Sequence, residues 1–97
     1  MPYEIRFALT AKRQLRAYQV GERAMIVAAV EAQLAHEPLV ETRNRKRLRP
    51  NPIAPWELRV RDLRVFYYVD DPGVVTVLAI GMKRGNKLCI EGEEIEL

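Results

Sequence analysis

Apolar residues alternate with polar or small ones over the first part of the chain, and this pattern predicts a half-buried β-strand over residues 3–9. The apolar spacing then becomes that of two amphipathic helices, at about residues 11–18 and 22–36. Their short connection predicts a helical hairpin. Thr10 is the expected N-cap of the first helix, and Gly21 is the expected break between the two.

The segment 56–68 alternates over its whole length and predicts a β-hairpin with Arg61 and Asp62 as its turn. With this turn one face is entirely apolar, in the opposing pairs Val60–Leu63, Leu58–Val65 and Trp56–Tyr67. The other face carries Glu57 and places Arg59 directly opposite Arg64. Because like charges opposite each other destabilise a sheet, this pair suggests that an anion binds between them. Nucleic acids are abundant cellular polyanions.

The remaining segments complete a mainly antiparallel sheet. Residues 41–55 are basic and rich in proline, and we expect them to be irregular. Next come a turn at 70–73, an aliphatic strand at 74–80, a basic turn at 83–86 and a short strand at 87–90, and the acidic tail is a candidate for one more strand. The predicted order is β-α-α-β-β-β(-β).

The predicted fold is therefore α+β, a twisted sheet with the helical hairpin packed on one face and residues 1–97 in one domain. The apolar face of the 56–68 hairpin is expected to meet the helices. Its charged face is then expected to be free to bind.

Composition narrows the possible chemistry. The chain contains one Cys, one His and no Ser. These counts exclude an internal disulfide, a zinc site built from Cys and His of one chain, and a serine nucleophile. The five glycines are scattered, so they form no glycine-rich phosphate loop. We expect no metal and no cofactor. The sequence has neither an apolar run of about 18 residues nor a signal-peptide pattern, so a cytoplasmic protein is expected.

Charge is distributed unevenly along the chain, whose formal net charge is +3. Between Arg43 and Lys87, eleven Lys and Arg residues stand against four Asp and Glu residues. The last seven residues contain four glutamates and no basic residue. This asymmetry predicts a basic binding surface, with the acidic tail placed elsewhere or folded against it.

The basic segment, followed by W-E-L-R-V at 56–60, L-R-V-F-Y at 63–67 and A-I-G-M-K-R-G-N-K-L at 79–88, resembles the RelE/ParE superfamily of toxins from type II toxin–antitoxin systems. The resemblance covers essentially the whole chain. It implies a cognate antitoxin as partner. RelE-like members are ribosome-dependent endoribonucleases that cut mRNA, inhibit translation and arrest growth. ParE-like members share the fold and poison DNA gyrase, so a gyrase inhibitor is the alternative, as is a catalytically degenerate module that only binds its antitoxin.

The resemblance also implies catalytic roles. Arg64 matches a catalytic arginine of RelE-like nucleases, and Arg59 matches a basic catalytic position on the preceding strand. Glu57 falls where some members have a carboxylate base, and Lys83 and Arg84 match a basic pair after the last long strand. If the strands pair so that residue 69 lies opposite residue 74, Lys83 shares the face of Arg64.

RNA cleavage without a metal needs a base for the 2′-hydroxyl proton, cations for the phosphorane and an acid for the leaving 5′ oxygen. Glu57 is the candidate base, and a simple ion pair with an arginine is the alternative. Met82 and Cys89 stand where several relatives have His and Tyr, so the acid is unassigned. Further RNA contacts are expected from Arg43, Arg45, Lys46, Arg47, Arg49, Arg61, Phe66 and Tyr68. The two aromatic residues would stack on unpaired bases, unless the tail covers them.

Overall fold

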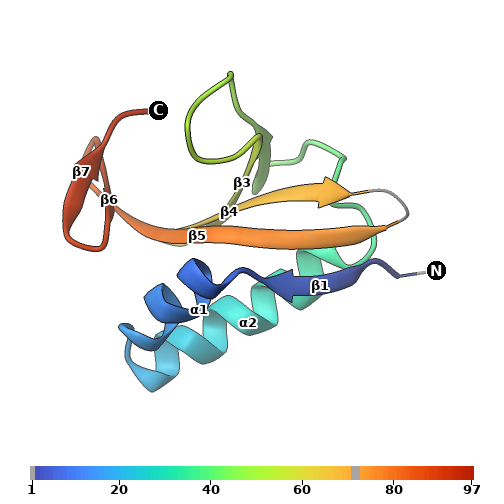
Figure 1. Ribbon diagram of the computed structural model, residues 1–97, viewed down its shortest axis with the longest axis horizontal. Coiled ribbons are helices and arrows are strands. Elements are labelled where there is room, and N and C mark those ends of the chain that lie inside the picture. Colours follow the sequence, from blue (N-terminus) through green and yellow to red (C-terminus); the bar gives the residue numbers. More distant parts are fainter. Residues whose placement is uncertain (1, 71–72) are drawn as a thin grey trace.

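The structure is a computed structural model that describes residues 2–70 and 73–97. Over these residues, helices α1 (Leu9–Arg16) and α2 (Val20–Leu34) cover one face of a seven-stranded sheet (Figure 1). The strands are β1 (Glu4–Phe7), β2 (Arg45–Arg47), β3 (Trp56–Val60), β4 (Leu63–Asp70), β5 (Val74–Arg84), β6 (Lys87–Ile90) and β7 (Glu93–Ile95). Neither helix in the described ranges is long and apolar enough to cross a bilayer. The predicted α+β architecture is confirmed.

Strand β5 lies at the centre of the sheet, whose order is β2-β3-β4-β5-β6-β7. One edge of β5 pairs with β4, and the other pairs first with β1, in parallel, and then with β6. Between these two partners the backbone N–H of Ile80 donates a hydrogen bond of 2.7 Å to the side-chain oxygen of Gln14. Gln14 of α1 therefore satisfies a strand edge that would otherwise be buried without a partner.

Both helices begin earlier than the sequence predicts. Helix α1 starts at Leu9, after Ala8, so Thr10 lies inside the helix and is not its N-cap. Helix α2 starts at Val20, and Gly21 lies in its first turn instead of breaking the chain. The start of α2 is held by the Glu22 side chain, which accepts the backbone N–H of Gln19 at 3.3 Å. This reciprocal cap fixes the first turn despite the glycine.

The main core lies between the helices and the sheet, and it contains the apolar face of the predicted hairpin. Helix α2 contributes Ile26, Val30 and Leu34, and the hairpin contributes Trp56, Leu58, Val60, Leu63, Val65 and Tyr67. All three predicted cross-strand pairs are confirmed, and the rings of Trp56 and Tyr67 are stacked 6.0 Å apart. Burial raises the pKa of Tyr67 well above its usual range, and its hydroxyl donates to the carbonyl oxygen of Pro38 at 2.7 Å.

A second apolar cluster covers part of the opposite face, which corrects the expectation that this face is free. Phe66 is fully buried there, packed with Ala54 of the β2–β3 loop and with Ala79 and Leu88 of the sheet. The partly buried residues packed around them are Leu48, Ile53, Leu78, Ile90 and Ile95. The loop and the β6–β7 hairpin both rise on this side of the sheet (Figure 1). The acidic tail does form a strand, and Phe66 is covered.

Two other segments differ from prediction. Residues 45–47 form strand β2 instead of an irregular segment, because the prolines lie beyond it and leave its pairing with β3 intact. Strand β5 continues past residue 80 to Arg84, which pairs with Lys87 across a turn at 85–86. The basic turn expected at 83–86 is therefore shorter. The turn expected at 70–73 lies partly outside the described residues.

The β4–β5 register contains a bulge. Asp70, not residue 69, lies opposite Val74, so the expected register is wrong by one residue. The register shifts between Phe66 and Tyr67, where Leu78 is an extra residue on β5. This extra residue reverses the alternation, so that beyond it Arg64 lies opposite Gly81. Lys83 lies two residues further along β5 and therefore on the same face as Arg64. This shared face was predicted, but from a pairing of residues 69 and 74 that the structure does not contain.

Gly81 permits the close approach of β6. A Cβ atom at this position would lie 2.8 Å from Cγ1 of Ile90 and 2.9 Å from the carbonyl oxygen of Cys89. The second contact is with backbone, which cannot move aside as a side-chain end can. Gly81 is therefore a condition for folding the β6–β7 hairpin over the sheet.

Gly21→Ala is expected to raise the free energy of unfolding by about 0.5–1 kcal/mol, because alanine loses less backbone entropy in a helix. A Cβ atom at Gly21 has no neighbour within 4 Å, so no clash offsets the gain. Urea denaturation followed by circular dichroism measures the change.

Gly81→Ala is expected to have the opposite effect. It should lower the free energy of unfolding by about 1–3 kcal/mol, because the added methyl group overpacks the contact with β6. Equal effects of the two substitutions would show that the β6–β7 hairpin does not depend on the close approach at Gly81.

Candidate functional site

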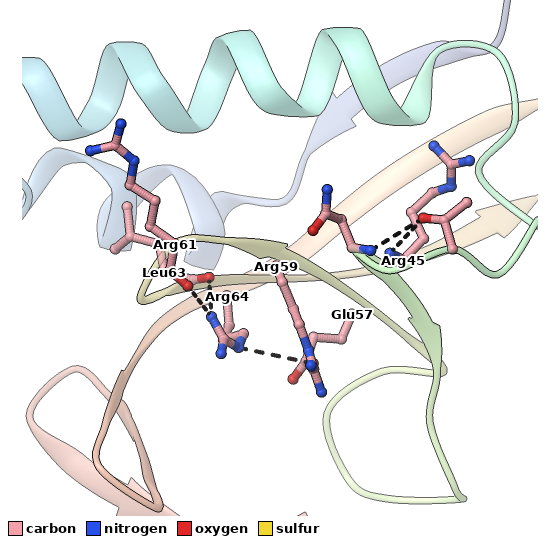
Figure 2. Close-up of polar contacts among 8 residues, drawn as sticks. Arg45, Glu57, Arg59, Arg61, Leu63 and Arg64 are labelled. Carbon is pink, nitrogen blue, oxygen red and sulfur yellow. Dashed lines mark hydrogen bonds and ion pairs between the residues drawn. The ribbon is translucent and has the colours of Figure 1, made fainter.

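Glu57, Arg59 and Arg64 converge on the side of the sheet away from the helices (Figure 2). The Oε1 atom of Glu57 lies 3.2 Å from Nε of Arg59 and 4.0 Å from Nε of Arg64. Arg59 lies directly opposite Arg64 in the register, as predicted. One carboxylate is thus shared by two guanidinium groups. The ion pair considered as an alternative for Glu57 is present, and it leaves the group with a net positive charge.

The two arginines differ in mobility. The Arg64 side chain is 13% exposed, and its Nη1 donates to the backbone carbonyls of Arg61 at 2.6 Å and Leu63 at 2.9 Å. Arg61 has a left-handed backbone with φ 57°, at the tip of the β3–β4 hairpin. The Arg59 side chain is 48% exposed. Arg64 is therefore a fixed cation at the floor of the site, and Arg59 is an accessible one above it.

Two lysines extend this group of charges. Lys46 of β2 lies directly opposite Glu57, and Lys83 reaches the same face through the β5 bulge. Within residues 2–70 and 73–97, neither amine has a carboxylate oxygen within 4.0 Å. We call the residues Lys46, Glu57, Arg59, Arg64 and Lys83 the arginine face. From the sequence, Lys46 was identified only as one residue of a basic run. Its position opposite Glu57 depends on strand β2, which the sequence did not predict.

Arg84 does not join the arginine face. Successive residues of a strand point to opposite sides of the sheet. Because Lys83 lies on the side away from the helices, Arg84 lies on the helix side. It lines a cavity of about 470 Å³ next to α1, together with Met82 and Cys89. Met82 and Cys89 lie opposite each other on β5 and β6. The two positions at which the chain departs from the family pattern therefore face away from Arg59 and Arg64.

The other predicted RNA-binding residues are dispersed. Arg45 is buried, and it donates to the carbonyl oxygens of Gln33 at 2.8 Å and Val40 at 2.9 Å, so it ties β2 to the end of α2. The guanidinium of Arg47 lies 5.9 Å from the centre of the Trp56 ring, on the helix side. Arg61 points from the hairpin tip toward the helix side (Figure 2). Arg43 and Arg49 are exposed, and Tyr68 is half-buried.

The acidic tail engages other cations. Glu91 pairs with Arg13 of α1, with Oε1 2.7 Å from Nη2, and Glu94 pairs with Lys87, with Oε1 3.3 Å from Nζ. Arg13 and Lys87 both lie away from the arginine face. Two of the four tail glutamates therefore pair with cations outside the arginine face. The sequence left two arrangements open, a tail folded against the basic surface or one placed away from it, and these two glutamates follow the second.

Comparison with models of protein families gives no match, and neither does comparison with curated proteins. Among solved structures, the chain is similar to one in the crystal structure of the toxin–antitoxin complex RelBE2 from Mycobacterium tuberculosis. The two are 30% identical with a TM-score of 0.73, and the match covers 86% of this chain and 93% of that one. The chain belongs to the RelE/ParE superfamily. Its order of two helices and sheet strands is that of a RelE-like toxin, and the arginine face lies on the side of this fold that the helices leave uncovered.

Glu57→Gln is expected to lower the free energy of unfolding by about 1–2 kcal/mol, because it leaves the largely buried guanidinium of Arg64 without its counter-charge. The same substitution is expected to increase the affinity for single-stranded RNA at low salt and to steepen its salt dependence. Urea denaturation and fluorescence anisotropy measure the two effects.

Glu4→Gln is the matched control, because Glu4 pairs with Arg6 at a solvent-exposed position of β1. It makes the same change in net charge, and little effect on stability is expected. Equal RNA affinity for both variants would mean that Glu57 does not modulate the charge of the arginine face.

Proposed function

We propose that this protein is the toxin of a type II toxin–antitoxin module and acts as a ribosome-dependent, metal-independent mRNA endoribonuclease. The observation that supports this most is the arginine face: Arg59 and Arg64 share the carboxylate of Glu57, and Lys46 and Lys83 from the two flanking strands lie on the same face of a RelE-like fold. A cationic group of this kind suits a phosphodiester, whose oxygens accept the paired N–H groups of guanidinium. Such a substrate can reach this face at Arg59, whose side chain is 48% exposed.

In the proposed reaction, Arg59 turns from Glu57 to the scissile phosphate and binds two of its oxygens. Arg64 remains at the floor and stabilises the charge that develops on the phosphorane. The freed carboxylate of Glu57 takes the proton of the 2′-hydroxyl, whose oxygen attacks phosphorus while the bond to the 5′ oxygen breaks. The products are a 2′,3′-cyclic phosphate and a 5′-hydroxyl. Because Met82 and Cys89 face the other side, the leaving oxygen receives its proton from solvent.

A cognate antitoxin is the proposed partner, and translating ribosomes supply the mRNA. The similar solved chain comes from a toxin–antitoxin complex, which supports a partner of this kind. Because the arginine face is basic, an acidic segment of the antitoxin is the complementary covering. Such a segment would compete with RNA for Arg59, the most exposed arginine of the site.

Induction of the chain without its antitoxin is expected to stop growth and to create new transcript 5′ ends, which primer extension maps. Arg59→Ala and Arg64→Ala are each expected to reduce cleavage by about 100-fold, because each removes a charged donor to the transition state. Arg16→Ala, an exposed change on α1 with the same loss of charge, is the control and is expected to cleave normally.

Other outcomes point to the alternatives. Growth arrest with intact mRNA, an SOS response and cleaved gyrase–DNA complexes would replace this proposal with a ParE-like gyrase inhibitor. Normal growth together with tight binding of the antitoxin would indicate a module that has lost its activity.

A further inference from the structure

An apolar recess lies next to the arginine face, on the same side of the sheet. Its volume is about 380 Å³. Leu78 and Ala79 of β5 form its floor, and its walls come from Pro52 and Ile53 of the β2–β3 loop and from Ile90 and Ile95 of β6 and β7. Both walls rise on the side of the sheet that the helices leave open (Figure 1).

The register of the sheet places this recess close to Arg64. Arg64 lies opposite Gly81, and Ala79 is the next residue of β5 on the same face, which makes it a diagonal neighbour of Arg64. Diagonal neighbours in antiparallel sheets are about 7–8 Å apart. Because Gly81 has no side chain, the Ile90 side chain occupies the space beside it and forms part of one wall of the recess. A phosphodiester at Arg64 therefore has the recess within the reach of an adjoining nucleotide.

The chemistry of the recess suits a flat apolar group with hydrogen-bond donors on its edge. Its floor and walls are aliphatic or proline, and its other lining residues are Glu91 and Glu93, both exposed at the rim. Glu91 is already paired with Arg13. Over residues 2–70 and 73–97, no cationic side chain lies within 4.0 Å of the Glu93 carboxylate. These carboxylates repel phosphate, so the recess and the arginine face suit different parts of a nucleotide.

We propose that this recess binds an unpaired nucleobase with an exocyclic amino group, next to the phosphodiester held by Arg59 and Arg64, and that Glu93 accepts the amino N–H. This inference rests on the proposed function. Aliphatic walls pack against the base faces, and the carboxylate distinguishes base edges, because it accepts from the N4 amino group of cytosine but is repelled by the O4 oxygen of uracil. Glu93 is then a specificity-determining residue.

The test compares short oligomers of deoxycytidine and deoxyuridine, which lack the 2′-hydroxyl and cannot be cleaved by attack of that group. These two bases differ at the edge that meets Glu93, while both stack weakly. Fluorescence anisotropy at low salt is expected to show that the purified protein prefers the cytosine oligomer by about threefold to tenfold, which corresponds to one net hydrogen bond. Glu93→Gln is expected to remove most of this preference.

Glu94→Gln is the matched control, because it changes the same charge on the neighbouring residue, which lies on the opposite face and pairs with Lys87. It is expected to keep the preference. Equal binding of the two oligomers by the unaltered protein, or loss of the preference in both variants, would overturn the inference.

The outcomes for the recess and for the nuclease are separable. If the protein cleaves mRNA but shows no preference for cytosine, the proposed nuclease function stands and the proposed nucleobase site in the recess is refuted. A preference that depends on Glu93, in a protein that cleaves no mRNA, supports the recess as a nucleobase site and refutes the nuclease.

Discussion

The hydrogen-bond register of β5 determines where the neighbouring strands and helices lie. This strand is paired along both edges, so the helical layer, the β3–β4 hairpin and the C-terminal hairpin are all placed relative to it. The extra residue at Leu78 exchanges the two faces of β5 beyond it. If Leu78 were paired and the register did not shift, Arg64 would lie opposite Ile80, Lys83 would lie on the helix side, and Arg84 would face the arginines. The bulge thus decides which basic residue of β5 shares a face with Glu57.

The sheet carries an apolar cluster on each face, and the arginine face lies beside the smaller one. The main cluster fixes the β3–β4 hairpin against α2. The smaller cluster packs the β2–β3 loop and the β6–β7 hairpin against the sheet, while the Arg59 side chain remains about half exposed. This arrangement accounts for the composition of the β3–β4 hairpin. Every second residue packs against the helices, and the opposite face carries Glu57, Arg59 and Arg64. Repulsion between Arg59 and Arg64 is tolerated because Glu57 lies between them.

The hairpin was predictable because strand alternation and a two-residue turn leave one register that gathers every apolar side chain on one face. Its arginine pair followed directly, and an ion pair of Glu57 with one of these arginines was the alternative to its role as a base. The sequence left two alternatives for Phe66, base stacking or cover by the tail, because the residues that cover it come from a loop and a tail distant in sequence. Arg45 was misinterpreted for a similar reason: its burial depends on the carbonyl groups of Gln33, at the end of α2, and of Val40, in the loop that follows. The start of α2 was missed because a capping interaction outweighs the cost of Gly21.

The carbonyl groups of Arg61 and Leu63 hold the Arg64 guanidinium in place before any ligand arrives. A free arginine side chain carries about 2 kcal/mol of rotamer entropy, which a ligand must overcome when it orders the group. At Arg64 much of this entropy is lost during folding, and the tip of the hairpin supplies the compensating contacts. The site therefore offers one preorganised guanidinium and one that can adapt, a combination of low entropic cost and adaptability for the proposed phosphodiester.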